Sequence, residues 1–176
     1  MRLEEASEEF HDFFDRHYAE LARLAYLLTG EPDAADDIAA DALVALWQHW
    51  DRFRAARHPL AYARGVVANL VRERIRSAVR ERRRIALFWS RAPEAIDLPD
   101  MPGTLDVRAA LARLPFRKRA CVVLRHAFDL SEKDTAMALG ISVGTVKSQT
   151  SKAMAELERL LGAAATGEPV MGGRTR

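Results

Sequence analysis

The chain is poor in the residues that build disulfide-linked, zinc-bound or turn-rich folds. Its 176 residues include one cysteine, Cys121, together with 9 glycines and 7 prolines. A single cysteine excludes a disulfide framework and a cysteine-based zinc site, and it is typical of proteins in a reducing cytoplasm. Few glycines and prolines disfavour sandwiches and solenoids, which need many tight turns. We expect Cys121 to be a buried small hydrophobe and not a redox sensor.

Long apolar runs are missing as well. The longest, Ala42 to Trp47, is far shorter than the roughly 20 residues that span a bilayer. The acidic segment Met1 to Glu9 lacks the basic and apolar regions of a secretory signal. Hydrophobic residues make up 49% and charged residues 30%, so the chain can bury a core. We therefore expect a soluble, cytoplasmic, helix-rich protein with no direct membrane insertion.

The charge is divided unevenly along the chain, although the net charge is only +2. Residues 1–50 carry three basic and twelve acidic side chains. Residues 51–90 carry eleven arginines, no lysine and three acidic side chains. Arginine suits bidentate phosphate contacts and stacking on bases. A solvated helix face is the simple interpretation of such runs, but arginine without lysine favours a polyanion partner for the second block and another partner for the acidic one.

Apolar residues at three- and four-residue steps predict an all-α fold with two small domains. In the first, residues 8–85, we expect helices over 8–29, 33–50 and 59–84, with a loop over Asp51–His58. Trp47 and Trp50 are expected to pack between helices. Asp33, Asp37 and Asp41 share one helix face, where like charges repel each other. Arg72, Arg76 and Arg80 follow an outward stripe of the third helix.

Residues 86–103 hold three prolines and lose the helical period, so we expect an extended linker. A second domain over 104–162 is predicted from shorter helices at 106–114, 116–128, 131–139 and 143–161. Residues 163–176 are expected to form a frayed tail.

Leu130–Leu157 has the pattern of a helix-turn-helix. Ser131 and Ser142 are placed to cap the two helices, and Gly140 permits the left-handed turn between them. Hydroxyls and lysine bind phosphates, while glutamine or lysine reads base edges in the major groove. The residues expected to face DNA from the second helix are Thr145, Lys147, Ser148, Gln149, Ser151 and Lys152.

Nothing in the sequence supports catalysis. The five histidines are scattered without metal-ligand spacing, and no phosphate-binding glycine loop or nucleophile–base motif is present. We expect no metal, no cofactor and no small-molecule substrate.

The segment LPFRKRACVVLRHAFDLSEKDTAMALGISVGTVKSQTSKAMAELERLL resembles the −35-reading domain of bacterial extracytoplasmic-function (ECF, group IV) RNA polymerase sigma factors. FDRHYAELARLAYLLTGEPDAADDIAADALVALWQHWDRFR, followed by HPLAYARGVVANLVRERIR, resembles the N-terminal domain of the same family. The two matches cover about residues 10–85 and 105–162. Core RNA polymerase and promoter DNA are the partners that this resemblance implies, and an anti-sigma factor is a further one.

The resemblance also assigns residue roles. It implies that the helix at 33–50 docks on the clamp helices of the polymerase, with Asp37 and Asp41 at its acidic positions. The loop at 51–58 and the helix after it correspond to the part that captures a flipped-out base of the −10 element. Phe53, Val66, Val67 and Asn69 match positions that line the capture pocket, and the arginine stripe would hold nearby phosphates. His58 lies in this loop, where it either contacts DNA or is simply exposed.

Departures from the family pattern limit what the resemblance implies. Ala40 stands where the family usually has glutamine, and Tyr62 replaces a common tryptophan. Gln149 replaces an arginine and Ser151 a larger side chain, which predicts a weaker phosphate grip and leaves the −35 sequence open. Two other classes remain: a stand-alone helix-turn-helix regulator that binds as a dimer, and a helical adaptor that does not bind DNA.

Overall fold

The computed structural model describes residues 3–88 and 107–166, and within these ranges every element is helical. In chain order the elements are α1 (Leu3–Thr29), α2 (Pro32–Gln48), α3 (Trp50–Arg54), α4 (Pro59–Phe88), α5 (Val107–Arg113), α6 (Phe116–Val122), the π-helix η1 (Val123–Ala127), α7 (Glu132–Leu139) and α8 (Val143–Thr166). The predicted all-α fold is confirmed.

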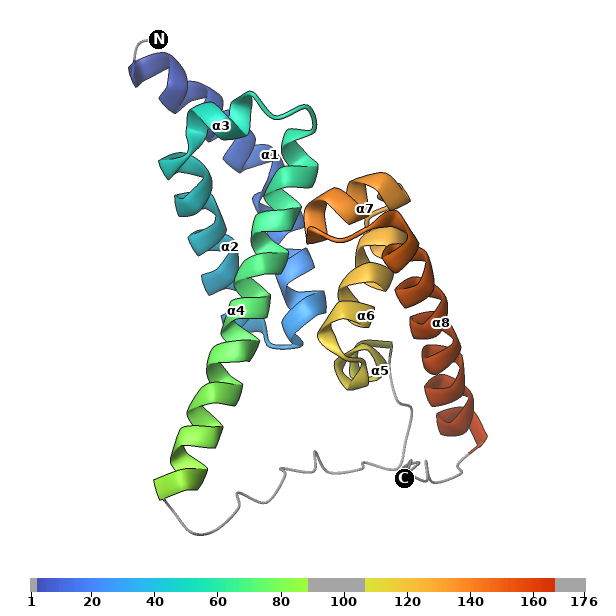
Figure 1. Cartoon of the computed structure of the whole chain (residues 1–176). Helices are drawn as coiled ribbons and strands as arrows, with labels where there is room; N and C mark the ends of the chain where they lie inside the picture. The colour runs from blue at the N-terminus through green and yellow to red at the C-terminus, as the bar shows by residue number, and fades with distance from the viewer. Residues whose placement is uncertain (1–2, 89–106, 167–176) are drawn as a thin grey trace.

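Helices α1 to α4 form the first group, in which α1, α2 and α4 pack against one another (Figure 1). Gly30, at φ 82°, turns the chain after α1, and Pro32 then occupies the first turn of α2. Ile38, Ala42 and Leu46 follow one another at four-residue steps on α2, and all three are buried in the core.

The structure corrects the prediction of a loop over Asp51–His58. Residues 50–54 form the short helix α3, and only 55–58 lie outside a helix. The reason is local: Trp50 and Phe53 are three residues apart, so one helical turn buries both rings, at 8% and 2% exposure. Phe53 packs edge-on against Phe13 of α1, with ring centroids 4.8 Å apart.

Two helices run further than expected. Helix α4 continues to Phe88, so residues 86–88 extend a helix, and the rest of the predicted linker lies outside the described residues. The C-terminal end of α4 projects beyond the other helices of its group (Figure 1). Helix α8 continues to Thr166, which includes the first residues of the predicted tail, and residues 167–176 are outside the described part.

Helices α5 to α8 form the second group, whose core includes Leu114, Leu124, Val146 and Leu160. The helix predicted over 116–128 changes at residue 123 from α6 to the π-helix η1. The chain leaves η1 through Asp129, at φ 49°, and the Leu130 amide then donates to the Leu124 carbonyl over 3.0 Å.

The two groups pack directly against each other. Helix α7 lies against the N-terminal half of α4, and α1 contacts α5, α6 and η1 (Figure 1).

Candidate nucleic-acid and polymerase interfaces

The predicted helix-turn-helix is formed by α7, a turn at residues 140–142 and α8. The Ser131 hydroxyl accepts a hydrogen bond from the Asp134 amide over 3.0 Å at the start of α7. Gly140, at φ 62°, ends α7 in the left-handed conformation that glycine adopts without strain. The Ser142 hydroxyl accepts from the Thr145 amide over 3.1 Å at the start of α8. Both caps and the glycine turn therefore form as the sequence predicted.

The polar face of α8 is available to a ligand. Val146 and Ala153 are fully buried, which turns the positions between them outward. Four of the residues predicted to face DNA are exposed: Lys147, Ser148, Ser151 and Lys152. The other two, Thr145 and Gln149, are half-buried. Lys147 Nζ lies 3.5 Å from Glu132 Oε2 of α7, but its side chain remains 63% exposed. An ion pair this exposed contributes little to stability, so Lys147 is free to exchange Glu132 for a phosphate.

Part of the predicted −10 site is a real pocket of about 260 Å³ on the surface of α4. Of the residues predicted for that site, His58, Val66 and Asn69 line the pocket. Phe53 and Val67 do not, because both are buried in the core, at 2% and 0% exposure. Phe53 packs against Tyr62, which does line the pocket, with ring centroids 6.1 Å apart.

Other residues of that pocket were absent from the predicted site. From the first group of helices they are Ala56, Arg57, Ala61, Tyr62 and Gly65. The helical period was the available signal, since Tyr62, Gly65 and Val66 precede Asn69 at steps that place them on one face. Met137 and Ala138 of α7 also line the pocket. No local pattern predicts these two, because their position depends on how the two groups pack.

The predicted arginine stripe follows the outer side of α4. Arg76 and Arg80 are exposed and Arg72 is half-buried. Arg76 Nη1 lies 3.2 Å from Glu73 Oε1 in a pair of two exposed side chains, 58% and 54%. Such a pair is weak, so the stripe retains its capacity to bind a polyanion.

The acidic stripe on α2 borders an apolar groove. Asp33, Asp37 and Asp41 are all exposed. The groove, of about 470 Å³, is lined by side chains from α1 and α2: Phe10, Phe14, Tyr18, Ala40, Leu43, Val44 and Trp47. Trp47 packs on Phe10, with centroids 4.9 Å apart, yet it remains 40% exposed, which the expectation of helix packing did not anticipate. Apolar surface framed by charge is typical of a protein-binding site.

Cys121 is fully buried in the second group. Burial raises the pKa of its thiol to about 11, and nearby Arg117 lowers it by a smaller amount. The reactive thiolate is therefore scarce at neutral pH. Over residues 3–88 and 107–166 there is no cluster of histidine, cysteine and carboxylate side chains able to hold a metal ion. No helix within the same ranges is long and apolar enough to cross a membrane.

Comparison with known proteins matches each of the two groups of helices to a protein family. Residues 13–81 match Sigma-70 region 2, and residues 104–157 match Sigma-70, region 4. The chain is 34% identical over 158 residues to the ECF RNA polymerase sigma factor SigM of Mycobacterium tuberculosis, which covers 90% of this chain and 80% of that protein. It is 33% identical over 170 residues to the RNA polymerase sigma-E factor of Streptomyces avermitilis, covering 87% and 85%.

Two solved structures share the fold. The sigma factor RpoE from Bartonella quintana, in complex with the anti-sigma factor NepR, matches with a TM-score of 0.72 and 26% identity over 88% of this chain and 98% of RpoE. CnrH, in complex with the cytosolic domain of CnrY, matches with a TM-score of 0.65 and 26% identity over 89% and 90%.

A DNA-reading helix-turn-helix that follows a Sigma-70 region 2 defines a promoter-recognition protein of the Sigma-70 class. The chain belongs to the ECF RNA polymerase sigma factors and directs transcription initiation as an alternative sigma factor. Proteins of this family are initiation factors and not enzymes.

Proposed function

We propose that the two groups of helices read two separate promoter elements, region 2 the −10 element and region 4 the −35 element. The observation that carries the proposal is the exposed polar face of α8, presented behind two formed serine caps. In a helix-turn-helix the second helix enters the major groove. We assign residues 8–85 and 104–162 to the two domains, 86–103 to the linker and 163–176 to the tail, and we place the protein in group IV of the sigma family.

The pocket on α4 is the proposed site for a flipped base of the −10 element. The Asn69 amide offers both a donor and an acceptor to a base edge, and it is exposed beside Val66 and Tyr62. Flipping a base costs a few kcal/mol, so a formed pocket with a ring to stack on favours the melted state. Arg72, Arg76 and Arg80 would hold the phosphates of the same strand.

The surface of α2 is the proposed polymerase dock. The aspartates Asp33, Asp37 and Asp41 supply charge complementarity, which orients the encounter. The adjoining groove supplies apolar contact through Val44 and Trp47, at 56% and 40% exposure. A basic, amphipathic helix of core polymerase fits both features.

We further propose a protein regulator of the anti-sigma class and a cytoplasmic site of action. Both RpoE and CnrH were solved with such a partner or with a partner's cytosolic domain. No metal, cofactor or small-molecule substrate enters the proposed function.

The test is transcription in vitro with sigma-free core polymerase and a library of genomic promoters. We expect the purified chain to bind core enzyme and to initiate from promoters that share two spaced upstream elements. A chain that binds DNA as a dimer without polymerase would support the stand-alone regulator. A chain that neither binds polymerase nor initiates would refute the proposal.

A further inference from the structure

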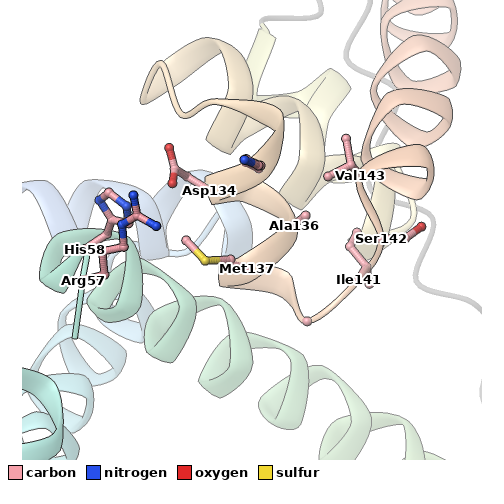
Figure 2. A pocket seen from close by; sticks show the side chains of 10 residues that line it. Arg57, His58, Asp134, Ala136, Met137, Ile141, Ser142 and Val143 are labelled. Carbon is pink, nitrogen blue, oxygen red and sulfur yellow. The ribbon is translucent and has the colours of Figure 1, made fainter. Parts of the chain in front are cut away.

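A pocket of about 490 Å³ lies where the two groups of helices meet, and the proposed function does not use it. One wall is the turn before α4, with Arg57 and His58 (Figure 2). The other wall is α7 together with residues 140–143, where the chain turns into α8. Small-molecule sites in proteins typically enclose about 300–1,000 Å³, so this pocket has the size of a ligand site.

Direct packing of α4 on α7 holds the two walls together. A Cβ added to Gly65 of α4 would lie 2.8 Å from the Ala138 carbonyl oxygen and 3.2 Å from the Ala138 Cα. Only a glycine lets the two helix backbones approach this closely, although glycine is unfavourable in mid-helix. The spacing of the walls is therefore fixed by backbone contact.

A second contact joins the two groups at the end of α1. The Arg119 guanidinium of α6 donates to the Leu28 carbonyl over 2.5 Å, and also to the carbonyls of Ala112 and Leu114 in its own group, at 2.8 and 3.0 Å. A cation is favourable there because the last carbonyls of a helix carry partial negative charge. With contacts at two separate points, the pocket is formed before any ligand binds.

Basic side chains from both groups line the pocket. Arg57 and His58 come from the first group and Lys133 from the second, and all three are exposed. Among the described residues, none of these three has an ion-pair partner. Arginine binds phosphate through two parallel hydrogen bonds, and lysine binds it as a point charge. The pocket therefore offers two permanent cations to a phosphate group.

Much of the remaining lining is apolar. Ala136, Met137, Ile141 and Val143 contribute to it, and Met137 is 60% exposed. Methionine is unbranched and polarisable, so it makes favourable contacts with an aromatic ring. A bare phosphate gains nothing from such a surface, whereas a ligand that carries a planar ring does.

One carboxylate lines the same pocket. The Asp134 Oδ2 atom accepts a hydrogen bond from the Ser131 hydroxyl over 2.6 Å, and the second oxygen, Oδ1, has no donor within the described part of the chain. A carboxylate repels a simple anion, but it accepts hydrogen bonds from hydroxyl and amine groups. The pocket is therefore suited to a ligand that combines a phosphate, a planar ring and hydrogen-bond donors.

We infer that this pocket binds a nucleotide. The phosphates contact Arg57 and Lys133, the base packs on Met137, and a ribose hydroxyl or base amine donates to Asp134. The site does not depend on the roles proposed for α4 and α8. Arg57, His58 and Met137 also line the pocket proposed for the flipped base. A bound nucleotide therefore competes with the −10 strand for these side chains, an effect that does rest on the proposed function.

The first experiment detects binding on the free, full-length chain. The probe is ATP, and the signal is the NMR resonance of the Met137 methyl group. We expect ATP to shift this resonance to saturation, while that of Met154, which lies outside the pocket at 36% exposure, stays unchanged. Arg57→Ala combined with Lys133→Ala should weaken ATP binding at least about tenfold, because both phosphate contacts are lost. The control is Arg159→Ala, which removes an exposed arginine outside the pocket.

Adenosine and pyrophosphate separate the two parts of the ligand. Each should bind at least about tenfold more weakly than ATP, because each lacks one set of contacts. Pyrophosphate that binds as tightly as ATP would indicate a simple anion site and overturn the inference. A Met137 resonance that ATP does not shift, or equal ATP affinity in the double variant and the parent chain, would overturn it as well.

The second experiment tests competition with DNA. A fluorescent single strand that carries the −10 sequence of a promoter found in the transcription assay is bound to the free chain. We expect ATP to displace it from the parent chain. Lys133→Ala should bind the strand normally, since Lys133 does not line the −10 pocket, but should need at least about tenfold more ATP for displacement. Displacement at the same ATP concentration in both chains would overturn the competition. If the strand does not bind while the Met137 resonance still shifts, the proposed −10 role fails and the nucleotide site stands.

Discussion

Replacing Lys147 and Gln149 together by alanine should abolish the preference for a matched −35 element while leaving the fold intact. Lys147 loses only its 3.5 Å contact with Glu132, in a pair that is 63% and 37% exposed. An exposed pair contributes about 0–1 kcal/mol, and alanine is the best helix former. We therefore expect the free energy of unfolding to fall by less than about 1 kcal/mol.

The effect on promoter use should be larger. A good contact to a base edge discriminates by about 1–3 kcal/mol, and 1.4 kcal/mol corresponds to a factor of ten. The double variant should therefore lose roughly 10- to 100-fold in initiation from promoters with a matched −35 element. Loss of one phosphate contact should also reduce the slope of log affinity against log salt by about 0.9.

The assay compares holoenzymes on a matched promoter and on one with a scrambled −35 element. Arg159→Ala is the control, because it removes a positive charge from an exposed position of the same helix, 12 residues further on. We expect the control to keep the difference between the two promoters and the double variant to lose it. If the double variant instead fails to bind core polymerase, or discriminates as well as the parent chain, region 4 does not read the −35 element through α8.

Three further outcomes are expected. Reversing Asp37 and Asp41 to lysine should weaken binding to core polymerase at least tenfold in a titration, since both are exposed on the proposed dock; unchanged affinity would contradict the docking role. Asn69→Ala should impair promoter opening in permanganate footprints without a change in stability beyond about 0.5 kcal/mol, because the side chain is exposed; normal melting would remove Asn69 from the site. Because burial raises the pKa of Cys121 from 9.0 to about 11, the folded state keeps its proton while the unfolded state loses it. The contribution of this thiol to the free energy of unfolding should therefore be fully present below pH 9 and fall by up to about 1.4 kcal/mol per pH unit towards pH 11. Urea titrations of Cys121→Ala should not show this pH-dependent loss of stability.

Local signals in the sequence were sufficient for the helix-turn-helix. Ser131, Gly140 and Ser142 act on the backbone within three residues of themselves, so their effects do not depend on distant parts of the chain. The same is true of the buried stripe of α2, which follows from the helical period alone. The short helix α3 was missed because five residues carry too little periodicity to distinguish a turn from a loop.

The interdomain arrangement could not be predicted from the sequence. Gly65 lies within a helix and forms no turn, so the sequence gives no reason for a glycine there. The reason is the close approach of the Ala138 backbone, which leaves no room for a side chain. Phe53 and Val67 were expected to line the −10 pocket, but which side of a helix faces the core depends on all of its neighbours. The exposure of Trp47 could not be predicted for the same reason, since its neighbour Phe10 comes from another helix.

Arg119 bears on the free energy that separating the two groups of helices would require. Its guanidinium is partly desolvated, which lowers its pKa, and one of its bonds crosses to the other domain. On separation, water can replace the Leu28 carbonyl, and renewed hydration of the charge offsets part of the lost contact. The bonds to Ala112 and Leu114 remain within its own domain. Separating the two groups at this point would therefore rehydrate a cation without unfolding either core, so we expect such a separation to be reversible.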